Sequence, residues 1–399
     1  MNRNNNRIIG DIEILRGLAV LMVLYAHLGF LIYWQPAWLK KSFDLFGFFG
    51  GVDLFFCISG FVISRSFLPQ ISNVWTDRKA AVSVTVAFWI RRCWRLLPSA
   101  WLWAILCLLC TFFGNPYIWG DKNNIVYDFV AAITHCYNFH SFAGLHGQAR
   151  TVHSTLGVYW SLSLEEQFYI LFPLILIILK NKARWVFLVL FILSFFIVFM
   201  PFIKGVPDFF RWGAFTFGVL IGWACWKKHY LYTALEPRFL GSSSHSSWLI
   251  VLFVFVFITL CSGHVAAKHT YSLLALASGF IVFVASFNKD YLNTNYFLSE
   301  ILCWLGSRSY SLYLIHMPSF LLTRNILYAI YGAEVDTTKA TFDPTLWQYV
   351  HLGIGFAFTF IFAELNYRFL ELPLRDKGKM IAQRYLETME SPPQKLDNQ

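Results

Sequence analysis

The chain has 399 residues, of which 57% are hydrophobic, 19% aromatic and only 14% charged, and its mean hydropathy is +0.53. This composition excludes an ordinary soluble domain and a disordered chain. The formal net charge of +10 is compatible with a nucleic-acid partner, but no basic arm stands apart from the apolar stretches. We therefore expect no nucleic acid and attribute the basic excess to membrane orientation.

Apolar stretches recur along the whole chain, separated by charged or turn-rich breaks. A run of about 20 apolar residues spans a bilayer as a helix, and the alternating pattern of a membrane barrel is absent. The sequence therefore predicts an all-α polytopic membrane protein with about ten transmembrane helices. The predicted spans lie near residues 12–34, 47–65, 95–113, 158–179, 185–203, 208–226, 247–262, 270–287, 301–329 and 348–369.

The distribution of Lys and Arg predicts the orientation of these spans. With the N-terminus in the cytoplasm, the inner segments hold most of the 32 Lys and Arg residues, and ten spans return the C-terminus to the same side. We assign residues 1–375 to a transmembrane domain and 376–399 to a cytoplasmic C-terminal tail. The basic segment that begins at Arg368 is expected on the membrane surface. The first span lacks a cleavage site and is predicted to be a retained anchor.

Two predicted loops are long. The inner loop, residues 66–94, ends in WIRRCWR, and the outer loop spans residues 114–157. The outer loop contains four histidines, but their spacings of five, six and seven residues match no standard zinc site, so no metal is expected. A disulfide between Cys136 and Cys261 is left open. The four histidines are His135, His140, His146 and His153.

Arg16 and His27 lie eleven residues apart in the first predicted span. Eleven helical residues turn through about 1100°, so the two side chains share one face about 16 Å apart along the axis. Ionisable groups within a span usually face a polar interior or a site. Taken singly, Arg16 is also explained as an interfacial residue paired with Glu13, and His27 as a buried histidine satisfied by a neighbouring helix. The pair favours a function more strongly than either residue alone.

Other spans bring titratable groups to the predicted depth of His27. These are Asp53 in the second span, Glu165 and Glu166 in the fourth, and His316 in the ninth. A histidine beside a carboxylate is the usual means of deprotonating a hydroxyl. Only one of the two adjacent glutamates can point at His27, and which one is left open. The glutamates are also explained as helix-start charges, and Asp53 as a hydrogen-bond partner of a neighbouring helix.

A basic cluster, Arg91, Arg92 and Arg95, stands where the third span is predicted to begin. Guanidinium groups bind phosphate through paired hydrogen bonds, so the cluster suits a polyphosphate ligand or lipid headgroups. A charged helix flank is the alternative interpretation.

These segments resemble acyltransferase family 3, the bacterial inner-membrane proteins that O-acylate surface polysaccharides and some small molecules. The resemblance covers most of the chain, although between about residues 185 and 295 only the hydropathy and Arg211 in RWGAF match. It rests on RGLAVLMVLYAH, GGVDLFFCISGF, RRCWRLLP, YWSLSLEEQFYILFP, GSRSYSLYLIHMP and YRFLELP.

The resemblance implies a ten-span domain of the bacterial inner membrane that uses cytoplasmic acyl-CoA, commonly acetyl-CoA, with no permanently bound cofactor. The acceptor is a hydroxyl of a surface carbohydrate or lipid-linked glycan, such as O-antigen, capsule or exopolysaccharide. By motif, His27 is the catalytic histidine, assisted by the family's acid, Glu166 or Glu165, and we add Asp53 to the catalytic candidates. Coenzyme binding is assigned to Arg16, Arg91, Arg92 and Arg95, and substrate binding to His316, Arg211 and Trp160.

The expected mechanism is direct attack of the acceptor hydroxyl on the thioester, with His27 as general base. A covalent acyl-enzyme is disfavoured because no serine or cysteine is evidently adjacent to His27. Transfer through a fused esterase-like domain, which some family members carry, is not expected in this chain. A transporter or flippase for a glycan or anionic substrate is the alternative, because buried His, Arg and Glu residues also mark transport pathways.

Overall fold

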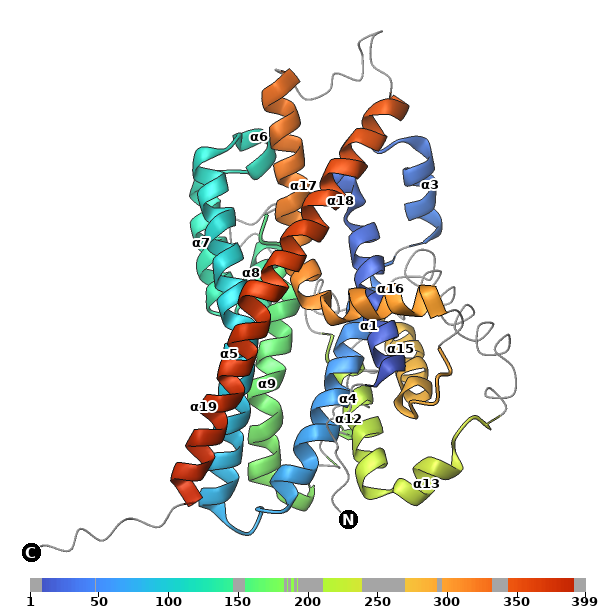
Figure 1. The fold of residues 1–399 in the computed structure, drawn as a ribbon, viewed down its shortest axis with the longest axis vertical. Helices are drawn as coiled ribbons and strands as arrows, with labels where there is room; N and C mark the ends of the chain where they lie inside the picture. Colours follow the sequence, from blue (N-terminus) through green and yellow to red (C-terminus); the bar gives the residue numbers. More distant parts are fainter. Residues whose placement is uncertain are drawn as a thin grey trace, which may run out of the picture.

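The computed structural model describes residues 9–46, 48–145, 155–182, 211–238, 270–292, 296–331 and 344–390, together with positions 185, 188, 189 and 192. Every regular element in these residues is a helix, which confirms the predicted all-α class. Figure 1 shows the longest helices running side by side along the long axis of the molecule. Shorter helices include α3 (Ala37–Leu45), α6 (Pro116–Trp119), α7 (Lys122–Ile133), α8 (Tyr137–Leu145) and α13 (His229–Ala234).

Four stretches of described helix are long and apolar enough to cross a membrane. They are α4 (Gly50–Ser72), α5 (Arg78–Phe113), α9 (Tyr159–Leu179) and the segment Leu346–Met389. The chain is therefore a helical membrane protein. The predicted spans 185–203, apart from single positions, and 247–262 lie outside the described residues. The count of ten and the orientation stay predictions.

The first predicted span is interrupted at the histidine that the sequence singled out. Helix α1 (Gly10–Ala26) ends there, α2 (Leu28–Leu31) follows, and His27 between them has φ −100° and ψ 4°. Its amide still donates to the carbonyl of Val23 at 3.3 Å. His27 therefore caps α1 and keeps the helical offset from Arg16.

The predicted inner loop, residues 66–94, is wrong. Helix α4 continues to Ser72, and α5 begins at Arg78 after a short turn. The Asp77 side chain caps α5 by accepting hydrogen bonds from the amides of Lys79 and Ala80 at 2.8 and 3.3 Å. Because no glycine or proline occurs before Pro98, the 36-residue helix runs on through the arginine cluster. Its length of about 54 Å exceeds the roughly 30 Å hydrocarbon layer.

The C-terminal basic segment is not a separate surface element. Helix α18 (Pro344–Asn366) continues through a π-helical turn at Tyr367–Glu371 into α19 (Leu372–Glu390), which packs along α5 (Figure 1). A Cβ atom added at Gly378 would lie 2.5 Å from Cβ of Trp94, so only glycine allows this close approach. The predicted boundary between residues 375 and 376 falls inside α19.

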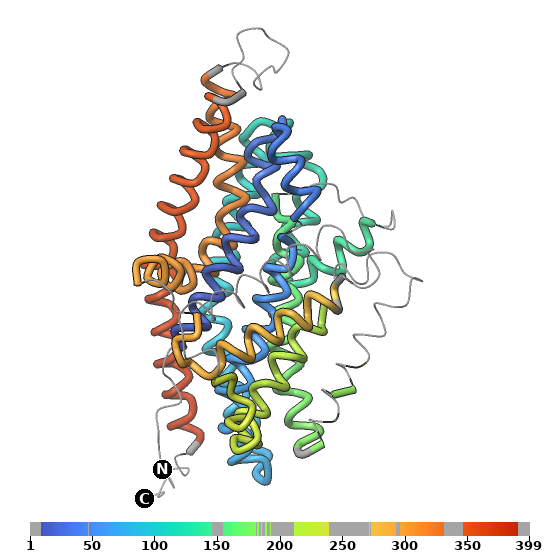
Figure 2. The backbone as a smooth tube through the Cα atoms, turned by 90° about the vertical axis from the view of Figure 1, so that its right-hand side faces the viewer, coloured from blue at the N-terminus to red at the C-terminus, as the bar shows by residue number. Residues whose placement is uncertain are grey.

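The single span predicted at residues 301–329 is also wrong, because the chain turns at Arg308. Helix α16 (Tyr296–Ser307) lies across the bundle and α17 (Ser309–Tyr331) runs along it (Figures 1 and 2). Arg308 binds Glu364 of α18 at 2.7 Å. Where α16 crosses α1, a Cβ atom added at Gly306 would lie 2.0 Å from the carbonyl oxygen of Glu13. The turn and this crossing leave α17 beside α1.

Helix α12 (Trp212–Lys227) packs closely against α4, and α15 (Thr270–Ser286) contacts both helices. Gly218 and Gly222 form a small-xxx-small pattern on the facing side of α12. A Cβ atom added at Gly218 would lie 2.0 Å from the carbonyl oxygen of Cys57 on α4. This contact brings the start of α12, with Arg211, beside the start of α4.

Candidate active site

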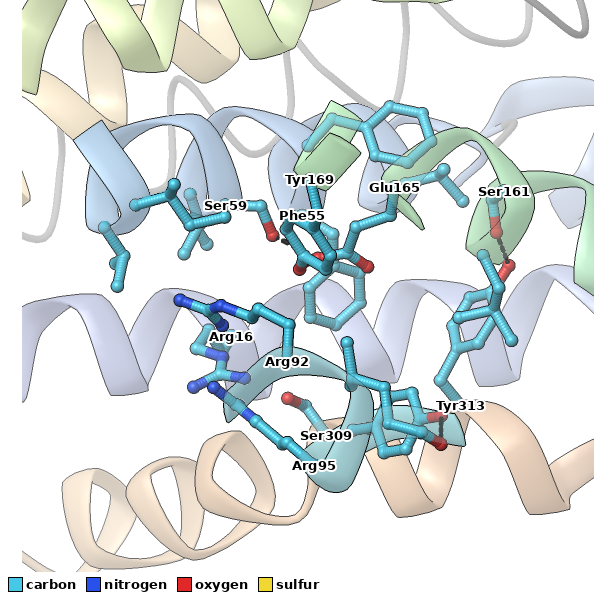
Figure 3. A pocket seen from close by; sticks show the side chains of 18 residues that line it. Arg16, Phe55, Ser59, Arg92, Arg95, Ser161, Glu165, Tyr169, Ser309 and Tyr313 are labelled. Carbon is cyan, nitrogen blue, oxygen red and sulfur yellow. Dashed lines mark hydrogen bonds between the residues drawn. The ribbon is translucent and has the colours of Figure 1, made fainter. Parts of the chain in front are cut away.

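A cavity opens between α1, α4, α5, α9 and α17, and 18 residues line it (Figure 3). Arginines gather at one end, and the hydroxyls of Ser161 and Tyr313 meet at the other. Glu165 and Ser59 lie between the two ends. The cavity therefore changes along its length from cationic to neutral and polar.

The cationic end consists of Arg16 from α1 and Arg92 and Arg95 from α5 (Figure 3). The guanidinium of Arg92 lies over the ring of Tyr169 at 5.1 Å, and Arg16 binds Glu13 at 3.1 Å, as the sequence suggested. The structure brings three of the four predicted coenzyme contacts together. The fourth, Arg91, does not line the cavity, because adjacent helical residues point about 100° apart.

Glu165 lines the cavity, whereas Glu166 does not. The carboxylate of Glu165 accepts a hydrogen bond from Ser59 Oγ at 2.5 Å and another from the hydroxyl of Tyr169. This carboxylate therefore lies on the path between the arginines and the neutral end. Within the described residues, neither glutamate has a hydrogen bond to His27.

His27 lies beside a second histidine where a carboxylate was expected. Its ring centroid is 4.9 Å from that of His316 on α17. His27 Nδ1 lies 2.8 Å from the carbonyl oxygen of Val23, and His316 Nδ1 lies 2.6 Å from that of Tyr313. Because a carbonyl only accepts, both Nδ1 atoms carry the proton and both Nε2 atoms are the basic nitrogens. Backbone carbonyls thus set the tautomer that general-base chemistry needs.

The histidine pair adjoins the neutral end of the cavity, although neither ring is part of the cavity lining. The ring centroid of His316 is 5.8 Å from that of Tyr313, which does line the cavity. His316 is fully buried, and its Nε2 atom has no hydrogen-bond partner in the described part of the chain. A buried acceptor without a partner costs about 1–3 kcal/mol, which favours a ligand or proton at this point.

Asp53 and Arg211 form a buried ion pair at 2.9 Å, joining α4 to the start of α12. Asp53 is 1% exposed, and the Arg211 guanidinium also lies over the rings of Trp160 and Tyr271 at 5.1 and 4.2 Å. Of the two interpretations of Asp53, this geometry supports the interhelical partner. Arg211 and Trp160, both predicted to bind substrate, belong to the same cluster and do not line the cavity.

Breaking this pair is expected to destabilise the protein. Asp53→Ala leaves the buried Arg211 charge without its carboxylate, which typically costs about 3–5 kcal/mol. Thermal unfolding of the detergent-purified protein measures the loss, and Asp53→Ala/Arg211→Met should be less destabilised than Asp53→Ala alone. Full stability of Asp53→Ala would contradict a structural role for the pair.

Several polar residues of the site were missed in the sequence. Ser59, Ser161, Tyr169 and Tyr313 line the cavity, and the spacing of four between Glu165 and Tyr169 was an available signal because such residues share a helix face. Glu371 in the π-helical turn was also missed. It is buried, accepts a hydrogen bond from Ser311 at 2.8 Å and interacts electrostatically with Arg95 and Arg16. Single π turns are frequent at functional sites.

Of the four histidines in the predicted outer loop, His135 and His140 are described by the structure, and neither lines the cavity. His140 Nε2 lies 2.7 Å from Asp128. Burial lowers the pKa of His135 below its ordinary value. His146, His153 and Cys261 lie outside the described residues, and Cys136 is an exposed free thiol.

Comparison with known proteins decides the family. A family model described as an acyltransferase domain matches residues 9–364, which include the arginine cluster, the cavity and the histidine pair. The chain belongs to acyltransferase family 3. In this acyltransferase family 3 domain, the two ends of the RGLAVLMVLYAH segment lie at opposite ends of the cavity. Arg16 lines the cationic end and His27 adjoins the neutral end.

Curated relatives of this acyltransferase family 3 chain are longer than it is. Peptidoglycan O-acetyltransferase OatA of Listeria monocytogenes is 28% identical over 394 residues, covering 94% of this chain and 57% of the relative. Putative peptidoglycan O-acetyltransferase YrhL of Bacillus subtilis is 27% identical over 396 residues, covering 94% and 56%. The chain thus spans less than two thirds of these relatives. No solved structure matches it.

Proposed function

We propose that this protein is a membrane-bound O-acyltransferase that transfers an acyl group, in the first instance acetyl, from acyl-CoA to a hydroxyl of a cell-surface carbohydrate. The observation that carries the proposal is the cavity with Arg16, Arg92 and Arg95 at one end and the His27 and His316 pair beside the other. The relatives' names support acetyl as the group and peptidoglycan as one acceptor. O-antigen, capsule and exopolysaccharide are the other candidates, with the bacterial plasma membrane as the location.

The arginine end suits the phosphates of coenzyme A. Guanidinium groups bind phosphate through paired hydrogen bonds, and a buried cationic site strengthens the interaction. The Nε atom of Arg95 is buried without a partner in the described residues, so a phosphate oxygen would satisfy it. The pantetheine arm would then extend past Glu165 toward Tyr313. It has to cover roughly the 16 Å that separates Arg16 from His27 along α1.

At the other end, His27 acts as general base in the proposed reaction. Its Nε2 atom takes the proton of the acceptor hydroxyl, and the hydroxyl oxygen attacks the thioester carbonyl. Holding both reactants beside the histidine pair supplies the proximity that direct transfer requires. No acyl-enzyme is needed in this route.

A transporter is the competing class of protein. The acyltransferase and transporter hypotheses make different predictions for the purified protein. The test uses the full chain in lipid nanodiscs with radiolabelled acetyl-CoA, and compares acetyl esters on surface glycans of wild-type and His27→Ala cells by mass spectrometry. We expect binding and turnover of acetyl-CoA, and loss of one ester in the variant. A protein that neither binds nor consumes acetyl-CoA, yet moves glycan across vesicles, would refute the proposal.

A further inference from the structure

Two hydroxyl groups meet at the end of the cavity remote from the arginines. Tyr313 of α17 and Ser161 of α9 share a short hydrogen bond, and both line the cavity (Figure 3). Each oxygen also lies 3.2 Å from the carbonyl oxygen of Val158. Both side chains are buried. Of their two protons, one serves the bond between the hydroxyls and the other is donated to the Val158 carbonyl. Because hydroxyl hydrogens rotate, both can be redirected to a ligand oxygen in the cavity.

These hydroxyls stand between the two other parts of the site. Tyr313 is three residues before His316 on α17, and their ring centroids are 5.8 Å apart. His316 in turn lies 4.9 Å from His27. Glu165, which separates the hydroxyls from the arginines, is held by its own partners, Ser59 and Tyr169. A donor anchored on the arginines would thus place its distal end against Tyr313 and Ser161, at the end of the cavity where His316 links Tyr313 to His27.

We propose that the hydroxyls of Tyr313 and Ser161 bind the oxygen of the thioester carbonyl and stabilise the negative charge that develops on it. This inference rests on the proposed acyltransferase function. Once both hydroxyls are directed at the bound thioester oxygen, they stabilise a developing oxyanion more strongly in a buried site than in water.

The acceptor hydroxyl gives its proton to His27 Nε2 and its oxygen forms a bond to the thioester carbon, while the carbonyl π pair moves onto the oxygen held by Tyr313 and Ser161. The pair then returns, the carbon–sulfur bond breaks, and the proton on His27 passes to the coenzyme A thiolate. The products are the ester and free coenzyme A, with no redox change.

A purely structural link between α9 and α17 is the competing explanation, and the chain offers a matched control for it. Tyr232 and Ser286 form another buried tyrosine–serine hydrogen bond, at 2.6 Å, between α13 and α15. Neither residue lines the cavity. Tyr232→Phe therefore removes the same kind of bond without touching the proposed oxyanion site.

The test compares Tyr313→Phe, Ser161→Ala, their double variant and Tyr232→Phe with wild type. We expect kcat to fall by about 10²–10³-fold in Tyr313→Phe, with an unchanged Kd for coenzyme A and with a double variant much less impaired than the product of the single effects. Tyr232→Phe should keep wild-type kcat. Thermal unfolding checks each fold, and Ser161→Ala gives a second reading if Tyr313→Phe is unstable.

Three results would overturn the inference while leaving the proposed function standing. The first is wild-type kcat in both Tyr313→Phe and Ser161→Ala. The second is a loss of kcat in these variants that is matched by an equal loss of coenzyme A affinity. The third is a loss of kcat in Tyr232→Phe as large as that in Tyr313→Phe. Failure of the wild-type protein to bind or turn over acetyl-CoA would instead refute the proposed function.

Discussion

His27→Gln is expected to lower the rate of acyl transfer by about 10²–10⁴-fold, the range typical for loss of a general base, while acyl-CoA still binds. The amide of glutamine cannot take up a proton at neutral pH, and His27 lies beyond the cavity end remote from the arginines. Transfer of label from acetyl-CoA to a glycan acceptor measures the rate. Equilibrium binding of coenzyme A, measured in parallel, shows whether the donor site is intact.

His351→Gln is the matched control. His351 on α18 is buried, and its Nδ1 atom, like that of His27, donates to the carbonyl four residues earlier, that of Trp347, at 2.9 Å. It does not line the cavity. We expect near wild-type transfer from this variant. Equal losses in the two variants would show that transfer requires a histidine bonded to its own helix backbone, and not a base.

Arg92→Gln and Arg95→Gln are each expected to weaken binding of coenzyme A by about 10–100-fold, because a hydrogen bond to a charged group contributes about 1.5–3 kcal/mol. The dissociation constant should rise more than kcat falls, since in the proposed complex the arginines hold the phosphates away from the reacting carbonyl. Isothermal titration with coenzyme A, and with dephospho-coenzyme A for comparison, measures the effect. Added salt should weaken the binding further.

Arg78→Gln provides the control on the same helix. Arg78 begins α5, is exposed and does not line the cavity. Its removal lowers the net charge of the protein by the same amount as either cavity variant. A loss of affinity in Arg78→Gln equal to that in Arg92→Gln would indicate a general electrostatic effect in place of a built phosphate site.

Much of the fold could be predicted because the hydrocarbon layer of a membrane requires long apolar helices. Apolar length alone located α4, α9 and α18, and the absence of alternation excluded strands. The error at residues 66–94 arose because charge was interpreted as the end of a helix. Arg92 and Arg95 lie within α5, where the ring of Tyr169 stacks on Arg92 and the cavity accepts both side chains. A buried polar cavity removes the penalty that would otherwise end an apolar helix.

Individual residues of the site could be predicted from the sequence, but the contacts between them could not. Helical periodicity predicts that Arg16 and His27 share a face, and His27 keeps the helical hydrogen bond to Val23 although α1 ends at Ala26. The positions of their partners depended on turns that leave weak sequence signals. The turn at Arg308 sets the register of α17 and so brings His316 to His27. The close packing of α12 on α4 likewise brings Asp53 and Arg211 together as an ion pair. Neither pairing follows from the spacing of residues along the chain.

Hydropathy and local motifs depend on short stretches of chain, so the helical membrane class, the family and the ionisable residues could be identified without the structure. Three features required the folded chain: which carboxylate lines the cavity, the pairing of His27 with His316, and the contact between Tyr313 and Ser161. Those outcomes depend on how far one helix slides and rotates against another. That register is set by glycine contacts and turns many residues away from the groups that it brings together.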